Sequence, residues 1–365
     1  MVATLELLDG RDARVGPLWT WLSRTTPSSF LSWGWIACWL DMLPADRVPQ
    51  LAVVRRDGRA VAAAFLGRHL ELRHGFVASR QLHLNATGIA RFDELCIEHN
   101  GMIGMDDGAL ATLVELLPGD WDELVLPGVQ RSALIPGARI DRASPAPYVD
   151  LAKVRARGDY LSLLGSSTRA QLRRARKTCG PLRTERANSI GDALAIYDEL
   201  VDLHAESWRA RGSPGAFADP WFAAFHRRLI AERHGAGEID LVRVRSAERT
   251  VGCLYNFVWR GRVVFYQSGL APPRDPHDKP GYLCHAAAIE AAAAAGHDTY
   301  DFLAGSADYK TRLATDETTL VWARIQRPRA RFALEDLLRT WRRMRSTPLA
   351  PTAQHEPLRI PDPVR

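Results

Sequence analysis

Four apolar segments lie in the stretch that organises this chain, Leu241–Lys310: LVRV at 241–244, VGCLYNFVW at 251–259, VVFYQSG at 263–269 and TYDFL at 299–303. They are rich in β-branched and aromatic residues and are interrupted by turn-like Arg260-Gly261-Arg262, so they predict four strands. Before the last strand, Pro280 suits the first position of a helix, and the alanine-rich segment after it is strongly helical up to Gly296. A strand that leads into a helix N-terminus predicts an anion site, because free N–H groups and the helix dipole face the ligand.

The rest of the chain alternates strand-like and helix-like segments around Arg142–Pro147, where two prolines are expected to interrupt regular structure. Asp57-Gly58 is typical of a hairpin turn, Ser32 of a helix N-cap, and Ser166 or Ser167 of another. Strands are expected at 3–7, 50–54, 60–66, 77–84, 92–97, 121–126 and 319–325, and 148–151 is expected to start the second half. Helices are expected at 18–22, 33–43, 109–116, 133–135, 159–164, 166–179, 190–212, 220–232 and 327–345.

Composition narrows the class of protein. The 365 residues are 46% hydrophobic, which is enough for two domains with sizeable cores. A net charge of +6 and a pI of about 9.2 fit either a soluble arginine-rich protein or one that favours anionic ligands. Five scattered cysteines without C-x-x-C spacing predict reduced thiols. There is no apolar run of membrane-spanning length and no basic region of a signal peptide, so we expect a cytoplasmic protein.

Motifs of several enzyme classes are missing from the sequence. There is no zinc-ligand spacing, Ser-His-Asp order, Walker sequence or G-x-G-x-x-G. This counts against metalloenzyme, hydrolase, kinase and dehydrogenase functions, and we expect no metal.

Several sets of residues together give the chain a family resemblance. They are Lys279-Pro280-Gly281, Asp301–Gly305 and Tyr309-Lys310 in the second half, Ser167–Arg169, Arg173–Lys177, His204, Trp208, Arg211 and Gly212 before them, and Phe30–Trp35 with Trp39 near the start. As a set they resemble the GNAT acetyltransferase fold, and in particular the BioF2-like or cellulose-biosynthesis acetyltransferases, which are related to the FemAB peptidyltransferases. The resemblance covers roughly residues 5–327. Where that family often has Ser-Pro-Gly, this chain has Lys279 in place of Ser.

The resemblance implies an α/β (α+β) tandem GNAT-like fold of two mixed sheets flanked by helices. We expect a degenerate GNAT-like half at 1–144, an acyltransferase half at 145–345 and a disordered, proline-rich tail at 346–365. The first half repeats the strand–helix order of the second but lacks its phosphate-site residues. The active cleft is therefore expected between the halves.

The expected co-substrate is acetyl-CoA or another acyl-CoA. Backbone N–H groups of Gly281 and Tyr282, behind Pro280, would meet its pyrophosphate, and Lys279 would add positive charge. An ordinary helix start is the alternative. Ser268 and Gly269 lie on the strand expected to run along the pantetheine arm, with Gly269 at a bulge or splay.

Acyl transfer to an amine needs a polarised carbonyl, a proton acceptor and a proton donor for the thiolate. The resemblance implies Tyr309 as general acid and Asp301 as general base, with His204 as another candidate base. Tyr266, which period-two alternation puts on the same face as Ser268, is a candidate donor to the thioester or the thiolate. Ordinary packing is the alternative for each.

Candidate substrate-binding residues come from both halves. Lys310 would meet an acidic substrate group or the cofactor, and Trp208 shares a helix stripe with His204. Glu98-His99-Asn100, at the end of an expected strand, would reach across the cleft. Arg169 and Arg173 lie on a basic helix that would contact the 3′-phosphate of CoA, an acidic substrate, RNA phosphates or only solvent.

The predicted function is an N-acyltransferase that moves an acyl group from acyl-CoA to an amine of a small molecule or amino sugar. Direct attack is expected, because no cysteine has a plausible activated position. A FemAB-like, aminoacyl-tRNA-dependent transferase is the alternative; it suits the positive charge, but no long coiled-coil arm or aromatic-rich RNA surface is evident. A non-catalytic partner of a polysaccharide or secretion system is the third reading. No DNA partner is expected, and the acyl chain, the acceptor and the oligomeric state are left open.

Overall fold

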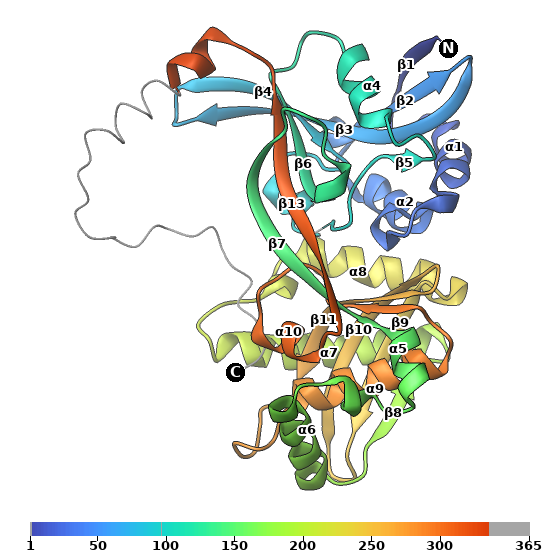
Figure 1. The fold of residues 1–365 in the computed structure, drawn as a ribbon, viewed down its shortest axis with the longest axis vertical. Coiled ribbons are helices and arrows are strands. Elements are labelled where there is room, and N and C mark those ends of the chain that lie inside the picture. Colours follow the sequence, from blue (N-terminus) through green and yellow to red (C-terminus); the bar gives the residue numbers. More distant parts are fainter. Residues whose placement is uncertain (1, 96, 336–365) are drawn as a thin grey trace, which may run out of the picture.

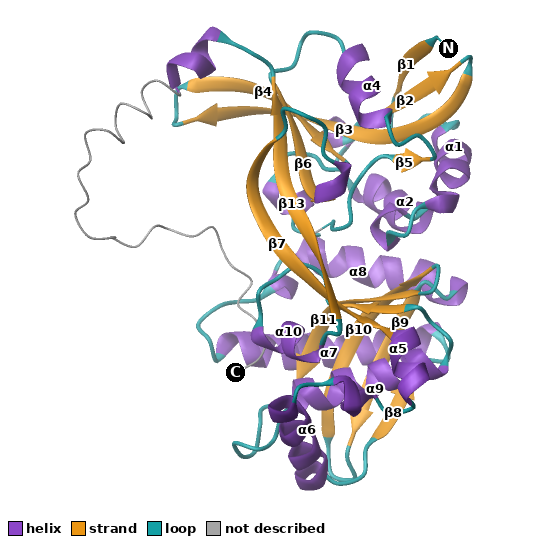
Figure 2. Ribbon diagram, viewed as in Figure 1, coloured by secondary structure: helices purple, strands orange, loops and turns teal. Residues whose placement is uncertain are grey.

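The computed structural model describes residues 2–95 and 97–335, which form two α/β halves along the long axis of the molecule (Figures 1 and 2). In the first half, Ser32 caps a helix by accepting from Trp35 N, and Asp57 and Gly58 both have positive φ, as a type I′ hairpin turn requires. Its elements are β1 Ala3–Leu8, α1 Val15–Leu22, α2 Trp33–Met42, β2 Gln50–Arg56, β3 Arg59–Arg73, β4 Val77–Leu84, α3 Ala90–Asp93, β5 Ile103–Gly104, α4 Ala109–Leu116 and β6 Glu123–Gln130.

The second half contains the stretch that the sequence singled out. Its elements are β7 Arg139–Asp150, α5 Leu151–Arg157, α6 Ser166–Cys179, β8 Arg183–Arg186, α7 Ile190–Arg209, α8 Pro220–Arg233, β9 Ile239–Arg245, β10 Thr250–Trp259, β11 Arg262–Leu270, α9 Pro280–Ala294, β12 Thr299–Asp301, α10 Asp308–Leu313 and β13 Asp316–Gln326. Helix α9 begins at Pro280 as predicted, and Gly296 follows its end with φ +82°. Of the helix expected at 327–345, residues 330–335 are helical, 327–329 are not, and 336–345 lie outside the described residues, as does the tail.

The α/β tandem arrangement is confirmed, and its two mixed sheets are joined into one. The strand order is β1-β2-β3-β4-β6-β13-β7-β12-β11-β10-β9-β8, with β5 paired to β3. Parallel pairs occur once in each half, β4 with β6 and β11 with β12. Strands β13 and β7 form the long ladder that runs from one half to the other, as Figure 1 shows.

Strand β7 crosses the position where the prolines were expected to break regular structure, so that expectation is wrong. Pro145 and Pro147 sit within β7 and pair with Thr319 and Glu317 of β13. The carbonyl oxygens of both prolines face the other edge, where Gly305 N and Phe302 N donate to them. A residue's N–H and C=O point to the same edge of a strand, so the missing N–H groups cost no bond to β13. The division of the chain at 144/145 stays a proposal.

Three hydrophobic clusters form the core, and one of them is shared by both halves. It joins Trp19, Phe30, Trp35 and Trp39 of the first half to Tyr255, Tyr266 and residues of α7 and α8 in the second. A second cluster packs α9 against the opposite face of the second-half sheet, and a third lies between α4 and the first-half sheet. The halves are therefore held together by continuous apolar packing as well as by the β7–β13 ladder.

Two local expectations are corrected. Residues 92–95 and 97 do not form the strand expected at 92–97: the Asp93 carboxylate accepts from the N–H groups of Thr87 and Gly88 and closes a turn around α3. Neither serine caps α6, whose N-cap is Gly165. No described helix is long and apolar enough to cross a membrane.

Candidate active site

The candidate active site lies where β11 and β12 separate. The strands pair only from Arg262–Thr299 to Val264–Asp301. Beyond these pairs β11 continues to Leu270, whereas the chain after Asp301 turns towards β7. We call 265–270 the first arm and 302–305 the second arm of this splay. A parallel ladder that stops inside a sheet exposes strand edges that an extended ligand can use.

A β-bulge at Tyr266 changes which side chains face the splay. The β10 partners shift at this point, so that Tyr255 pairs with Gln267. Tyr266 packs in the core shared by the halves, whereas Ser268 pairs with Leu254, whose side chain lies in the core beside α9. The expectation that Tyr266 and Ser268 share a face is wrong, because the extra residue reverses the alternation.

Gly269 is not the bulge; it is a point of close approach between β11 and α7. A Cβ at Gly269 would lie 2.3 Å from the backbone oxygen of Leu200 in α7. Its lack of a side chain therefore sets how close the first arm lies to α7.

The start of α9 has the features of an anion site. Its N-cap Lys279 makes no side-chain capping bond, and the first helical hydrogen bond runs from Leu283 N to Lys279 O, 3.1 Å. The N–H groups of Gly281 and Tyr282 therefore have no acceptor inside the helix, although both residues are buried. This arrangement fits a phosphate better than it fits water.

The loop before α9 is held rigidly. The Asp278 carboxylate, 6% exposed, accepts from the Arg249 guanidinium and from Arg274 N. The side chain of Arg274 pairs with Glu248. Because Arg249 balances Asp278, this carboxylate does not make the start of α9 repulsive to an anion.

A first-half segment, Leu95–His99, crosses both arms of the splay. Tyr266 Oη donates to Leu95 O on the side of the first arm, 3.1 Å. Ala304 N on the second arm donates to Glu98 Oε2, 2.5 Å. His99 Nε2 lies 2.9 Å from Asp301 Oδ2 at the point where the strands separate. The structure thus brings Glu98 to the second half, as the sequence suggested, and its role stays a prediction.

Asp301 is the centre of a buried ionic cluster. It is 1% exposed, and its carboxylate contacts His99, Arg262 (2.7 Å) and the N–H of Leu303 (2.8 Å). Burial alone would raise the pKa of Asp301, but these three partners hold it well below its usual range. A carboxylate with so low a pKa is a weak proton acceptor, which counts against the general-base role expected for it.

His204 lies behind the first arm. Its Nδ1 is 3.2 Å from Ser268 O, and its ring packs on Trp208 and Phe217. Burial lowers the pKa of His204 to about 4, and its Nε2 is buried without a hydrogen-bond partner among the described residues. The Nδ1–H therefore donates to the carbonyl, and Nε2 is an unprotonated acceptor.

Tyr309 and Lys310 are both buried beside the second arm. The Tyr309 ring stacks on His285 at 5.4 Å between centroids, and His285 contacts both Phe265 and Phe302 at the base of the splay. Lys310 Nζ donates to Ala304 O, 2.7 Å. Tyr309 is 2% exposed, so it would need a change of packing to reach a substrate directly.

The remaining predicted contacts lie farther from the splay. The Asn100 amide is committed to its own half, with bonds to Asn85, Leu84 O and Pro127 O. On α6, Arg173 is exposed, whereas Arg169 is half-buried with a long contact to Ser162 O, 3.5 Å. The structure does not bring these residues together with Glu98 and Asp301.

Sequence reasoning missed Arg262, His226 and His285. His99 was expected to reach across the cleft together with Glu98 and Asn100 but was given no role of its own, and Arg262 was interpreted only as a turn residue. His226 is fully buried, with Tyr255 and Tyr266 hydroxyls at its two nitrogens, 3.3 and 3.1 Å. No local pattern distinguishes such a histidine from others on an amphipathic helix.

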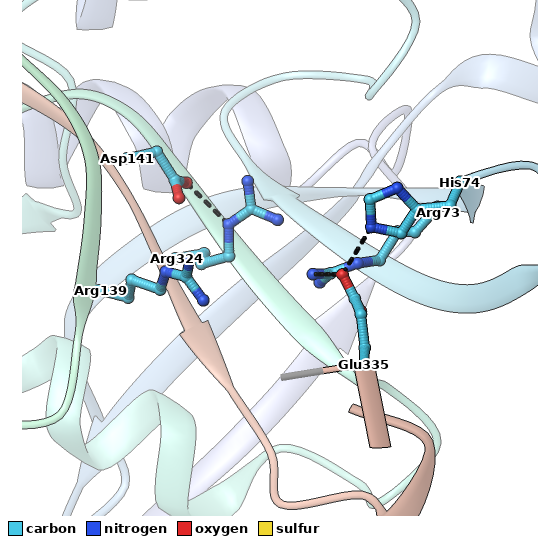
Figure 3. A pocket seen from close by; sticks show the side chains of 6 residues that line it. All are labelled: Arg73, His74, Arg139, Asp141, Arg324 and Glu335. Atoms are coloured by element: carbon cyan, nitrogen blue, oxygen red, sulfur yellow. Dashed lines mark hydrogen bonds and ion pairs between the residues drawn. The ribbon is translucent and has the colours of Figure 1, made fainter. Parts of the chain in front are cut away.

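A separate hollow of about 290 Å³ lies near the β3–β4 hairpin (Figure 3), away from α9. Its lining residues are Arg73, His74, Arg139, Asp141, Arg324 and Glu335. Arg324 pairs with Asp141, and Arg73 with Glu335, as Figure 3 shows. Since these charges largely neutralise each other, the hollow does not compete with the splay as an acyl-transfer site.

Comparison with known proteins identifies the class. Residues 166–311 match the family model described as an acetyltransferase (GNAT) domain. A search of curated proteins finds no match. The chain therefore contains a GNAT domain and is an acyltransferase by class.

Solved structures share the fold over nearly the whole chain. One is FemX, with 11% identity, 91% of this chain and 99% of that chain covered, and a TM-score of 0.57. Another is the C-terminal domain (DUF2156) of a putative lysylphosphatidylglycerol synthetase from Agrobacterium fabrum, with 13% identity, coverages of 89% and 96%, and a TM-score of 0.53. A conserved protein of unknown function from Bacteroides thetaiotaomicron VPI-5482 has 13% identity, coverages of 85% and 96%, and a TM-score of 0.50. The fold is thus that of a FemAB-related GNAT protein.

Proposed function

We propose that this protein is an N-acyltransferase that transfers an acyl group from acyl-CoA to an amine of a small molecule or amino sugar. The observation that carries the proposal is the uncapped, buried start of α9 beside the splay of β11 and β12. The N–H groups of Gly281 and Tyr282 would hold the pyrophosphate, and Lys279 would add charge. The open edge of the first arm, with Ser268, would pair with the pantetheine.

Direct attack of the amine on the thioester is favoured by the state of the thiols. Burial raises the pKa of Cys38 and Cys253 to about 12 and that of Cys284 well above its usual value. The half-buried Cys179 also has a raised pKa. None of these four described cysteines is an activated nucleophile, which favours direct attack over an acyl-enzyme on any of them.

The proposal predicts that acetyl-CoA stabilises the protein and that Gly281→Glu removes the effect. A carboxylate at this position would repel the pyrophosphate at the start of α9. At about 100 times its Kd, a ligand adds about 2.7 kcal/mol, which a thermal-shift assay detects easily. Gly191→Glu is the matched control, because Gly191 is the second residue of α7 as Gly281 is of α9, and it is exposed. No shift with acetyl-CoA, longer acyl-CoAs or free CoA would refute the proposal.

A second candidate is transfer from aminoacyl-tRNA. It is favoured by α6, where Arg173, Arg174 and Lys177 are exposed and have no ion-pair partner among the described residues. Such a surface suits a phosphate backbone. If CoA has no effect but charged tRNA binds in a salt-dependent manner, this candidate replaces the first.

A further inference from the structure

We propose that Glu98, which the first half contributes, takes the proton from the incoming amine. The inference rests on the proposed function and adds to it a residue from outside the GNAT domain. It gives the degenerate half a chemical role in the reaction as well as a packing role.

The position of Glu98 supports this role. Glu98 reaches the second arm of the splay, where its Oε2 accepts from Ala304 N, 2.5 Å. The neighbouring contacts of Leu95 with Tyr266 and of His99 with Asp301 fix this segment at three points across the splay. An acyl group held in the splay would therefore lie close to this carboxylate, and an amine that attacks the acyl group could give up its proton there.

One oxygen of the Glu98 carboxylate is available to a substrate. Glu98 Oε1 accepts no hydrogen bond within the described residues, although the residue is only 9% exposed. Asp301 is fully engaged by His99 and Arg262, and His204 turns Nδ1 to a carbonyl. Glu98 is the carboxylate of this cluster with an oxygen left for a substrate ammonium.

The charges around Glu98 also favour it as the proton acceptor. The charged or titratable groups around Glu98 are Lys310, His99, Asp301 and, through Asp301, Arg262. Burial raises the pKa of Glu98, and the Asp301 charge adds to this effect, while Lys310, Ala304 N–H and His99 lower it. A carboxyl with a raised pKa is a better proton acceptor than Asp301, whose pKa is lowered.

The backbone beside the Glu98–Ala304 contact has an unusual conformation. His99 and Leu303 both have positive φ, 50° and 61°, without being glycine. They flank the Glu98–Ala304 contact from its two sides. Unfavourable conformations of this kind persist where the surrounding structure fixes the geometry of a functional group.

In the proposed transfer, the amine nitrogen loses two protons and gains one bond to carbon. The ammonium R–NH3+ gives one proton to the Glu98 carboxylate and becomes R–NH2. The nitrogen lone pair forms the C–N bond to the thioester carbonyl, and the C–S bond then breaks with its electron pair on sulfur. The second nitrogen proton passes to the thiolate, and Glu98 returns its proton to water.

The test compares Glu98→Gln with Glu94→Gln, an exposed glutamate of the same segment. Acetyl-CoA turnover is measured with 2-aminoethanol and glucosamine as acceptor probes, together with acetyl-CoA thermal shifts. Glu98→Gln should lower kcat about 10²–10⁴-fold and remove the acidic limb of the pH profile, while the thermal shift and the control stay as in wild type. Unchanged kcat in Glu98→Gln would overturn the inference alone. A wild-type protein that acetyl-CoA does not stabilise would overturn the proposed function.

A second measurement does not depend on the acceptor. With carbon-13 in the glutamate carboxyl groups, the NMR signal missing from Glu98→Gln should titrate above the ordinary value of about 4.3 and shift when acetyl-CoA is added. A signal that titrates at or below that value overturns the inference. If neither amine probe reacts, this titration decides the question.

Discussion

Single buried residues carry most of the unusual chemistry of this molecule. Three buried histidines and the half-buried His83 are neutral rings: burial lowers the pKa of His83 and His204 to about 4 and that of His226 and His285 to about 3. In the unfolded chain these rings titrate near 6.5. Their function in the fold is to pack and hydrogen-bond without charge, as His226 does between two tyrosine hydroxyls.

These histidines predict a loss of stability in mild acid. Each folded-state pKa is depressed, so below about pH 6.5 the unfolded chain binds protons that the folded chain does not. The stabilisation is complete above that pH and falls by up to about 1.4 kcal/mol per pH unit for each ring. Urea unfolding at several pH values between about 6.5 and 4 measures the slope. His226→Leu should reduce it, and exposed His277→Gln should not; equal slopes in all three proteins would contradict this account.

At the level of elements, the splay depends on how β11 is held against its neighbours. The bulge at Tyr266 reverses its alternation, and Gly269 lets α7 approach its backbone. Helix α9 on the other face leaves its first N–H groups free. Strand β11 and helix α9 would therefore each contact part of the proposed thioester co-substrate.

Gly269→Ala should destabilise the protein by about 1–3 kcal/mol, because the new Cβ would overlap Leu200 O and push α7 away from β11. Chemical denaturation gives the change in the free energy of unfolding. Gly235→Ala is the control, since no heavy atom lies within 4 Å of the position of its Cβ. A Gly269→Ala protein as stable as wild type would show that the approach of α7 is not tight.

The molecule as a whole is two similar halves with one shared interior. The β7–β13 ladder, the aromatic cluster around Trp35 and Tyr266, and the crossing segment Leu95–His99 all connect them. The crossing segment lies at the proposed active site, so the contacts that join the halves also shape the site.

This arrangement predicts a single cooperative unfolding transition in spite of the length of the chain. Tryptophan fluorescence, which reports mainly on the shared core, and far-UV circular dichroism should give coincident urea curves. Leu95→Ala, in that core, should shift both curves together. Two separated transitions would mean that the halves are independently stable.

Local features of the chain were readable from the sequence. Pro280 and Gly296 bounded α9, Asp57-Gly58 formed the hairpin, Ser32 capped α2, and the second half matched a GNAT domain. These features depend on backbone preferences and side-chain bonds within a few residues, or on motifs of a known family. The uncapped start of α9, where we propose that an anion binds, belongs to this group.

Other features required the folded chain. Glu98 and Ala304 are in contact although they are 206 positions apart. The prolines of β7 do not interrupt the sheet, because their carbonyl oxygens accept from Gly305 N and Phe302 N and their missing N–H groups cost no bond to β13. A bulge puts Tyr266 on the face opposite to the one that alternation indicated. A contact of this kind depends on how elements pack, and no pattern in nearby residues encodes it. The proposed cofactor side of the site was thus a matter of local sequence, whereas the position of Glu98, the proposed proton acceptor, was set by long-range packing between the two halves.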